Sequence, residues 1–295
     1  MYLTYIPQPP LSSFVERFWL TEECDQPFTR EVALPSGNTQ LILMLEGDPQ
    51  RIVTQRGSRC EQVFGESLVR APGADWYLLN AGRRMLRLGV QFKPGGSHPF
   101  FRLPMSELRN AHEPLDALWG APARELRERL LELQTANERF QLVERFLLAQ
   151  AVRPLTYHPA VAYALHLLRS GTGDYSIAEI VDQVNFSHRQ FIALFRESVG
   201  LAPKEYVCLR RFLMAARYAY DDSPVAWNEL ALRFGYSDQA HLCNEFRAFS
   251  GLTPRSYLKH RHPRLSTYIP LPDEGDIGLL MNRSSEPQER SIAKS

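Results

Sequence analysis

The spacing of apolar and polar residues changes near residue 121 and divides the chain into two parts. Before this point, short apolar runs such as "TQLILMLEGDP" and "LRLGVQFKPGG" are broken by Gly, Pro, Asn and Asp, which is typical of strands and turns. After it, apolar residues recur at helical spacing. The pattern predicts an α+β protein whose residues 1–120 form a mostly β domain, a cupin-like barrel or a sandwich. The apolar cluster at 14–19 fits a helix or an edge strand equally well.

Two amphipathic helices are predicted directly after the β domain, at about 122–133 and 137–151. Their apolar faces consist of Leu126, Leu130 and Leu133 in the first and Phe140, Val143 and Leu147 in the second. Residues 121–154 either cover the barrel or pair two chains, and the sequence leaves both roles open. Residues 155–262 read as entirely helical. The segment 263–295 is rich in Pro, Ser, Asp and Glu, which predicts a flexible tail.

The helical part contains an internal repeat. The stretches "GLAPKEY" at 200–206 and "GLTPRSY" at 251–257 are nearly the same, and the match continues upstream at an offset of 50. The corresponding apolar positions are Ile177, Ile180 and Val181 in the first copy and Trp227, Leu230 and Ala231 in the second. Further along, Phe195 corresponds to Phe246 at an offset of 51. Two copies of this length indicate a duplicated structural unit.

Each copy predicts two helices joined by a sharp turn. The turn falls at Asn185 or Gly235, residue types that tolerate a left-handed backbone. Ser187 or Ser237 follows at the N-cap position of the second helix, which ends at a glycine. This is the helix-turn-helix arrangement, and one helix over Lys204–Tyr220 is expected to join the two units. An ordinary helical hairpin uses the same caps, but the duplication favours DNA binding.

At these residues the sequence resembles the AraC/XylS family of transcription regulators. The segment "ELALRFGYSDQAHLCNEFRAFSGLTPRSYLKHR" is very close to the family signature, and the first copy resembles its upstream partner. More weakly, "LPSGNTQLILMLEGDP" and "LGVQFKPGGSHPFF" resemble an uncharacterised N-terminal domain found on some of these regulators. The resemblance implies a cytoplasmic, sequence-specific regulator that is not an enzyme. It also implies that two recognition helices, about 188–199 and 238–249, enter successive major grooves of double-stranded DNA.

Candidate base contacts follow from the outward faces of these helices. The resemblance places them at Arg189, Ile192 and Ala193 in the first unit and at Gln239, Ala240, His241, Cys243 and Asn244 in the second. Gln190 also faces outward, and its amide can pair with adenine as Arg pairs with guanine. Family members often carry Arg where this chain has Ala193 and Asn244, so fewer guanine contacts are expected.

Candidate phosphate contacts lie at the ends of the same helices. They are Ser187, Arg196, Lys204, Ser237, Arg247, Arg255 and Lys259. Residues 155–262 contain 12 basic and 10 acidic residues, so the placement of these groups matters more than their sum. Any one of them could equally be a solvated surface residue.

Composition and residue spacing argue against several other classes of protein. The 295 residues carry a net charge of +1, and the apolar runs are too short to cross a bilayer. The N-terminus does not resemble a signal peptide. The four cysteines of the chain lack the spacing of metal ligands, and we expect them to be reduced thiols. His98 and His112 are too sparse for a metal site, and no cofactor is predicted.

The function of the β domain stays open. The resemblance implies that it binds a small-molecule effector, and RNA polymerase and a second copy of the chain are further candidate partners. Two alternatives remain: an architectural DNA-binding protein that senses nothing, and a DNA-repair-type enzyme with a reactive cysteine. Cys24 and Cys60 lack the neighbouring cysteines that such chemistry uses. The sequence does not specify the effector, the operator or the sign of regulation.

Overall fold

The N-terminal domain consists of two antiparallel sheets. The computed structural model describes residues 1–24, 30–54, 60–80, 84–169, 176–221, 225–260 and 268–270. The strands are β1 (Tyr2–Tyr5), β2 (Val15–Cys24), β3 (Arg30–Ala33), β4 (Gln40–Gly47), β5 (Gln50–Thr54), β6 (Cys60–Phe64), β7 (Ser67–Arg70), β8 (Tyr77–Asn80), β9 (Arg84–Phe92) and β10 (His112–Glu113). Six strands form one sheet in the order β1-β2-β9-β4-β7-β10, and the other, which includes β11 (Tyr268–Pro270), has the order β11-β3-β8-β5-β6. The ambiguous cluster at 14–19 is therefore mostly strand, in β2.

Alternation along the strands divides the apolar residues between three cores. In β4, Leu41 and Leu43 face outward toward helices, whereas Ile42 and Met44 face the space between the two sheets. This explains why the whole run "LILML" is buried. In the other sheet, Val32 likewise faces outward and its neighbour Ala33 faces inward. Both sheets are thus covered on both faces.

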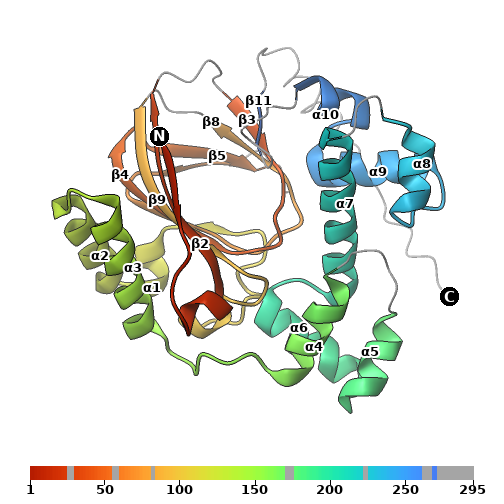
Figure 1. Cartoon of the computed structure of the whole chain (residues 1–295), viewed down its shortest axis with the longest axis horizontal. Helices are drawn as coiled ribbons and strands as arrows, with labels where there is room; N and C mark the ends of the chain where they lie inside the picture. Colours follow the sequence, from red (N-terminus) through yellow and green to blue (C-terminus); the bar gives the residue numbers. More distant parts are fainter. Residues whose placement is uncertain are drawn as a thin grey trace.

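Three helices cover the outer face of the six-stranded sheet (Figure 1). They are α1 (Leu115–Trp119), α2 (Ala121–Glu132) and α3 (Ala136–Gln150), which confirms the two helices expected from the sequence. Short 3-10 turns at Leu11–Ser13 and His98–Phe100 complete this layer. A capping box between Thr135 and Glu138 starts α3. The helices use Leu126, Leu130 and Phe140 to pack on the sheet, so this face is a covered core.

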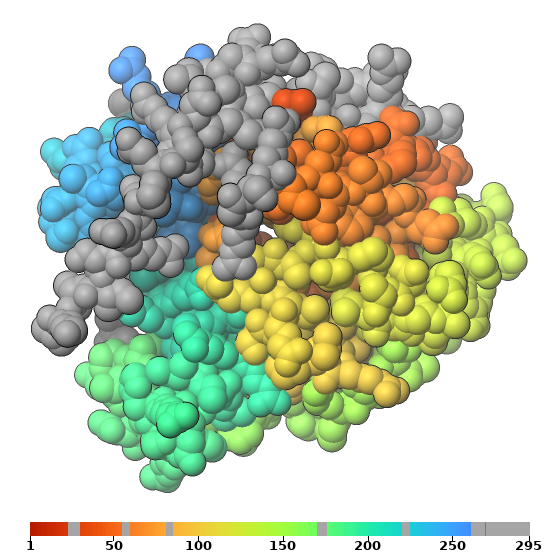
Figure 2. Space-filling model, turned by 180° about the vertical axis from the view of Figure 1, so that it is seen from behind, coloured from red at the N-terminus to blue at the C-terminus, as the bar shows by residue number. Residues whose placement is uncertain are grey.

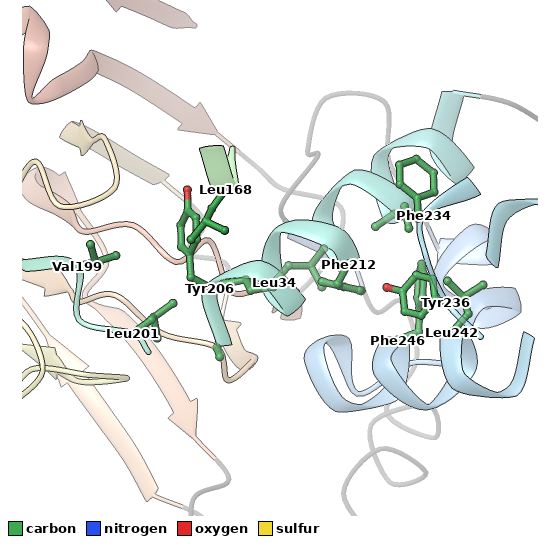
Figure 3. Close-up of a cluster of buried hydrophobic side chains, with 14 of the residues drawn as sticks. Leu34, Leu168, Val199, Leu201, Tyr206, Phe212, Phe234, Tyr236, Leu242 and Phe246 are labelled. Atoms are coloured by element: carbon green, nitrogen blue, oxygen red, sulfur yellow. The ribbon is translucent and has the colours of Figure 1, made fainter. Parts of the chain in front are cut away.

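The outer face of the five-stranded sheet packs against the C-terminal helices. These are α4 (Pro159–Leu168), α5 (Ile177–Val184), α6 (His188–Val199), α7 (Pro203–Asp221), α8 (Trp227–Arg233), α9 (Gln239–Ser250) and α10 (Pro254–His260). One continuous apolar cluster contains Val32, Leu34 and Leu78 of the β domain together with Phe195, Phe212 and Phe246 of the helices. Figure 3 shows Leu34, Phe212 and Phe246 of this cluster. Figure 2 shows the orange and yellow β domain against the green and blue helices from behind. The two halves therefore share a core.

The chain returns to the β domain after the last helix. Strand β11 (Tyr268–Pro270) pairs antiparallel with β3, and Ile269 is 2% exposed. The flexible tail expected over 263–295 is therefore wrong for these three residues, because the free edge of β3 supplies hydrogen-bond partners that composition does not reveal. Apart from β11, the tail lies outside the described residues. Among the helices that the structure describes, none is long and apolar enough to cross a membrane.

Candidate nucleic-acid interface

The first helix-turn-helix unit consists of α5 and α6 and follows the sequence prediction closely. Asn185 adopts the left-handed conformation, with φ of 55°, and closes the turn. Ser187 is the N-cap of α6, and it forms the predicted capping box with Gln190. The Ser187 hydroxyl accepts a hydrogen bond from the Gln190 N–H at 3.3 Å, and the side-chain amide oxygen Oε1 of Gln190 accepts one from the Ser187 N–H at 3.1 Å. The start of this recognition helix is thus fixed by neutral groups.

The second unit, α8 and α9, has the same plan with a different cap. Gly235 supplies the left-handed turn residue, with φ of 70°. The N-cap of α9 is Asp238, whose carboxylate accepts from the His241 N–H at 2.7 Å, so the prediction of Ser237 as the cap was wrong. An aspartate satisfies the free N–H groups of a helix start and also favours the positive end of the helix dipole. This hydrogen bond lowers the pKa of the Asp238 carboxylate below its ordinary value.

Both recognition helices end as the sequence predicts. Gly200 and Gly251 are left-handed C-caps, with φ of 89° and 70°. Pro203 and Pro254 then begin the next helices, where no backbone N–H is needed. The 19 residues of α7 span about 28 Å at 1.5 Å per residue. The length of this connecting helix is close to the distance of roughly 34 Å between successive major grooves on one side of DNA.

The structure places most of the candidate contact residues on the surface. The exposed base-contact candidates are Arg189, Gln190, Ala193, Gln239, Ala240 and Asn244, whereas Ile192, His241 and Cys243 are half-buried. All phosphate-contact candidates are exposed: Ser187, Arg196, Lys204, Ser237, Arg247, Arg255 and Lys259. The side-chain amide oxygen Oε1 of Gln190 accepts hydrogen bonds in the capping box. Bidentate pairing of Gln190 with adenine would therefore require this cap to open.

Sequence reasoning missed a polar cluster that fixes α9 against α7. Arg211 of α7 donates to Glu245 of α9 at 2.5 Å, and both side chains are 16% exposed. The Arg211 guanidinium also lies 4.4 Å from the centre of the Tyr236 ring, a cation–π arrangement. His241 meets the same ring edge-on. Because α7 and α9 are 34 residues apart at this pair, only the fold could reveal the cluster.

Burial in this cluster changes how its neutral groups titrate. Desolvation, followed by the nearby Glu245 carboxylate, raises the pKa of Tyr236 and that of the Cys208 thiol. A raised pKa keeps the thiol protonated and weakly nucleophilic. Cys208 therefore does not have the environment of a reactive cysteine.

A cavity of about 680 Å³ lies between the ends of the two sheets and α9. Its hydrogen-bonding side chains include Ser36, Asn38, Gln40, Thr54, Gln62, Arg70 and Asn110, with Trp76, Tyr77 and His112 as ring systems. Ala248 of α9 completes the wall. His112 is 7% exposed, and Nδ1 of its ring has no hydrogen-bond partner among the residues described. Burial and the neighbouring Arg70 lower the pKa of His112 to about 3.

Two family models match separate parts of this chain. Residues 180–260 match the family described as a helix-turn-helix domain. Residues 3–114 match a second family, described as a domain of unknown function, DUF6597.

The curated relatives resemble this chain over about a third of its length. An uncharacterised regulator of the helix-turn-helix type from Haemophilus influenzae is 27% identical over 93 residues, which cover 32% of this chain and 31% of that protein. An AraC-like transcription regulator from Streptomyces antibioticus is 32% identical over 107 residues, covering 36% of this chain and 35% of its own length. The chain thus spans about a third of the length of the curated relatives it matches.

The chain also resembles a solved structure, at lower sequence identity. ToxT from Vibrio cholerae aligns with 88% of this chain and 98% of its own length, at 10% sequence identity and a TM-score of 0.47. Similarity at this level is too low to transfer a ligand or a mechanism.

Proposed function

We propose that this protein is a sequence-specific, DNA-binding transcription regulator. The observation that supports this proposal best is the presentation of two capped, surface-exposed recognition helices by one connecting helix, α7. A rigid spacing of this kind suits two successive major grooves. The AraC-type relatives, which carry the name of transcription regulators, add to this support.

Base reading is assigned to the N-terminal half of each recognition helix. In the first unit, Arg189 is the guanine reader, while Ile192 and Ala193 contact thymine methyl groups or the backbone. In the second unit, Gln239 and Asn244 are the adenine readers, with Ala240, His241 and Cys243 beside them. Because His241 is held by Asp238 and packs on Tyr236, its contribution depends on an ordered helix start.

Genome-wide mapping of bound DNA tests the proposal directly. We expect discrete sites that contain two half-sites about one helical turn apart. Arg189→Ala should relax sequence preference at one base pair by about 1–3 kcal/mol, whereas Lys204→Ala should weaken binding to all sequences and reduce its salt dependence. Binding without sequence preference would contradict the proposal.

The cavity beside α9 is the proposed effector site. Its volume falls in the range of small-molecule sites, and its hydroxyl, amide and guanidinium groups suit a polar ligand with several hydrogen-bonding groups. A metabolite screen by thermal unfolding tests this assignment, since a ligand that binds the native state raises the unfolding temperature. Gln40→Ala should reduce the shift. No shift across a broad screen would favour the alternative of an architectural DNA-binding protein.

A second copy of the chain and RNA polymerase are the proposed protein partners. Leu131 of α2 and Leu148 of α3 are 39% and 43% exposed, which leaves apolar surface on the helices that cover the barrel. Light scattering of the wild type and of Leu148→Asp tests dimer formation. Purified transcription with RNA polymerase, with and without an operator site, tests the other partner and gives the sign of regulation.

A further inference from the structure

The C-terminal ends of both recognition helices meet the same five-residue segment of the β domain, Pro72–Trp76. A Cβ atom at Gly200 would lie 2.9 Å from Cβ and Cγ of Pro72. A Cβ atom at Gly251 would lie 2.6 Å from Cε2 and Cζ2 of Trp76. Both values are below ordinary van der Waals contact, so each glycine is required for this close approach as well as for its left-handed backbone.

The segment is itself held rigidly by one side chain, Asn110. Its Oδ1 accepts from the N–H groups of Ala74 at 2.8 Å and Asp75 at 3.3 Å, and its Nδ2 donates to the Asp75 carboxylate at 2.8 Å. The Asn110 N–H donates to the Pro72 carbonyl at 2.9 Å. At Gly73, a Cβ atom would lie 2.2 Å from Asn110 Oδ1, so only glycine fits there. Four bonds to one residue make the segment a stiff part of the β domain.

Each helix-turn-helix unit has further contacts that hold it against the β domain. On the first unit, the Met105 N–H donates to the Glu197 carbonyl at 2.9 Å, and Arg109 pairs with Glu205 at the start of α7. The second unit is also followed by β11, which pairs with β3 of the β domain. The C-terminal ends of α6 and α9 therefore both contact the β domain. Their separation does not depend on α7 alone.

We infer that Pro72–Trp76 fixes the separation of the two recognition helices by holding both of their C-terminal caps. The same segment forms part of the cavity wall, because Gly73, Asp75, Trp76 and Asn110 all line it. Trp76 consequently has one side toward the cavity and contacts the cap of α9. An occupant of the cavity would act on the second recognition helix through Trp76. This consequence for regulation rests on the proposed function, whereas the mechanical role of the segment does not.

Hydrogen exchange of the full chain tests the mechanical role without DNA. The cap amides of Gly200 and Gly251 donate to Arg196 and Arg247 at 2.9 Å and report on each helix end. Trp76→Ala should speed exchange near Gly251 about tenfold, the factor that corresponds to about 1.4 kcal/mol, and leave Gly200 unchanged. Asn110→Ala should speed exchange at both caps. Gln62→Ala is the control, because Gln62 lines the cavity but lies on β6, away from the caps.

A rescue experiment separates contact from general destabilisation. Gly251→Ala should loosen the end of α9, and adding Trp76→Ala should remove the steric part of that loss. Gly120→Ala is a control for replacing a glycine of positive φ without any steric contact, since Gly120 has φ of 69° and nothing within 4 Å of a Cβ atom. Unchanged exchange at both caps in Trp76→Ala and Asn110→Ala, or no rescue in the double variant, would overturn the inference.

Binding to DNA then tests the regulatory consequence. On operators identified by mapping, the wild type should prefer one spacing between half-sites, and Trp76→Ala should accept neighbouring spacings more evenly. Altered exchange with unaltered spacing preference would retain the mechanical role and reject the regulatory one. Absence of sequence-specific operators would reject the proposed function and leave the exchange result standing.

Discussion

The first recognition unit closes its turn with Asn185 and starts its reading helix with Ser187, whereas the second uses Gly235 and Asp238. The first is thus capped by groups that do not titrate, and the second by a carboxylate. The second unit also has the Arg211–Glu245 pair that joins α9 to α7. Duplicated sequence therefore preserved the backbone plan of the two units while the polar groups that stabilise them diverged.

The difference teaches how one fold can support unequal halves. Apolar packing is equivalent, because Phe195 and Phe246 are both fully buried at matching positions of the repeat. The buried ion pair between the recognition helix and α7, with its contacts to Tyr236 and His241, is a feature of the second unit. We therefore expect the two units to respond alike to core mutations and differently to charge and pH.

The largest effect should be the same in both units. Phe195→Ala and Phe246→Ala each leave a cavity in a fully buried site and should cost about 3–5 kcal/mol of stability. Thermal unfolding of the two variants measures this. If only one variant were destabilised, the apolar equivalence of the two units would be wrong.

A smaller loss should be confined to the second unit. Arg211→Ala leaves Glu245 without its guanidinium partner and should cost about 2 kcal/mol, less than a fully buried pair because both side chains keep some exposure. Hydrogen exchange should rise in α9 and stay unchanged in α6. Lys204→Ala, which removes another basic side chain, an exposed one, from the same helix, serves as the comparison variant. An equal rise of hydrogen exchange in α6 and α9 would contradict the conclusion that the Arg211–Glu245 pair stabilises only the second unit.

The N-caps should respond differently to acid. Ser187→Ala should cost about 1 kcal/mol at every pH. The folded-state pKa of Asp238 is depressed, so its stabilisation is present above the unfolded value of about 3.9 and is lost as the pH falls through the lower folded value. The amide NMR shift of His241 should titrate in this range, while that of Gln190 should not. Asp238→Asn should abolish this titration. If the His241 amide shift still titrated in that variant, another ionisable group would be responsible.

The smallest effect concerns the surface of the first helix in each unit. Leu232 of α8 is 72% exposed, and the repeat aligns it with the polar Asp182 of α5. Leu232→Asp should change stability by less than about 0.5 kcal/mol and leave DNA affinity unchanged. Reduced transcription with unchanged DNA binding would identify Leu232 as part of a contact with RNA polymerase and sharpen the difference between the units.

Local signals explain why much of the DNA-reading half was predictable. Turn residues, N-caps and C-cap glycines act within a few residues, so Asn185, Ser187, Gly200 and Gly251 have the roles expected of them. The cap at Asp238 was missed because Ser237 and Asp238 are adjacent and both residue types cap helices well. Which of two neighbours caps a helix depends on the exact turn geometry.

The spacing of residues along the sequence could not predict the long-range contacts. The shared core between sheet and helices, the Arg211–Glu245 pair and the seating of both caps on Pro72–Trp76 join residues far apart along the chain. None of these leaves a periodic signal. The return of β11 to the β domain was likewise hidden, because three residues in a polar tail do not resemble a strand until an edge is available.

The sequence by itself determined the two-part organisation, the duplicated helix-turn-helix units and the residues that face away from their cores, since periodicity and capping are properties of neighbouring residues. The tertiary structure alone decided that the reading units share a core with the β domain and that one stiff segment meets both recognition helices. The physical reason is that such contacts depend on the relative placement of whole elements, which burial of their apolar faces sets only once the chain has folded.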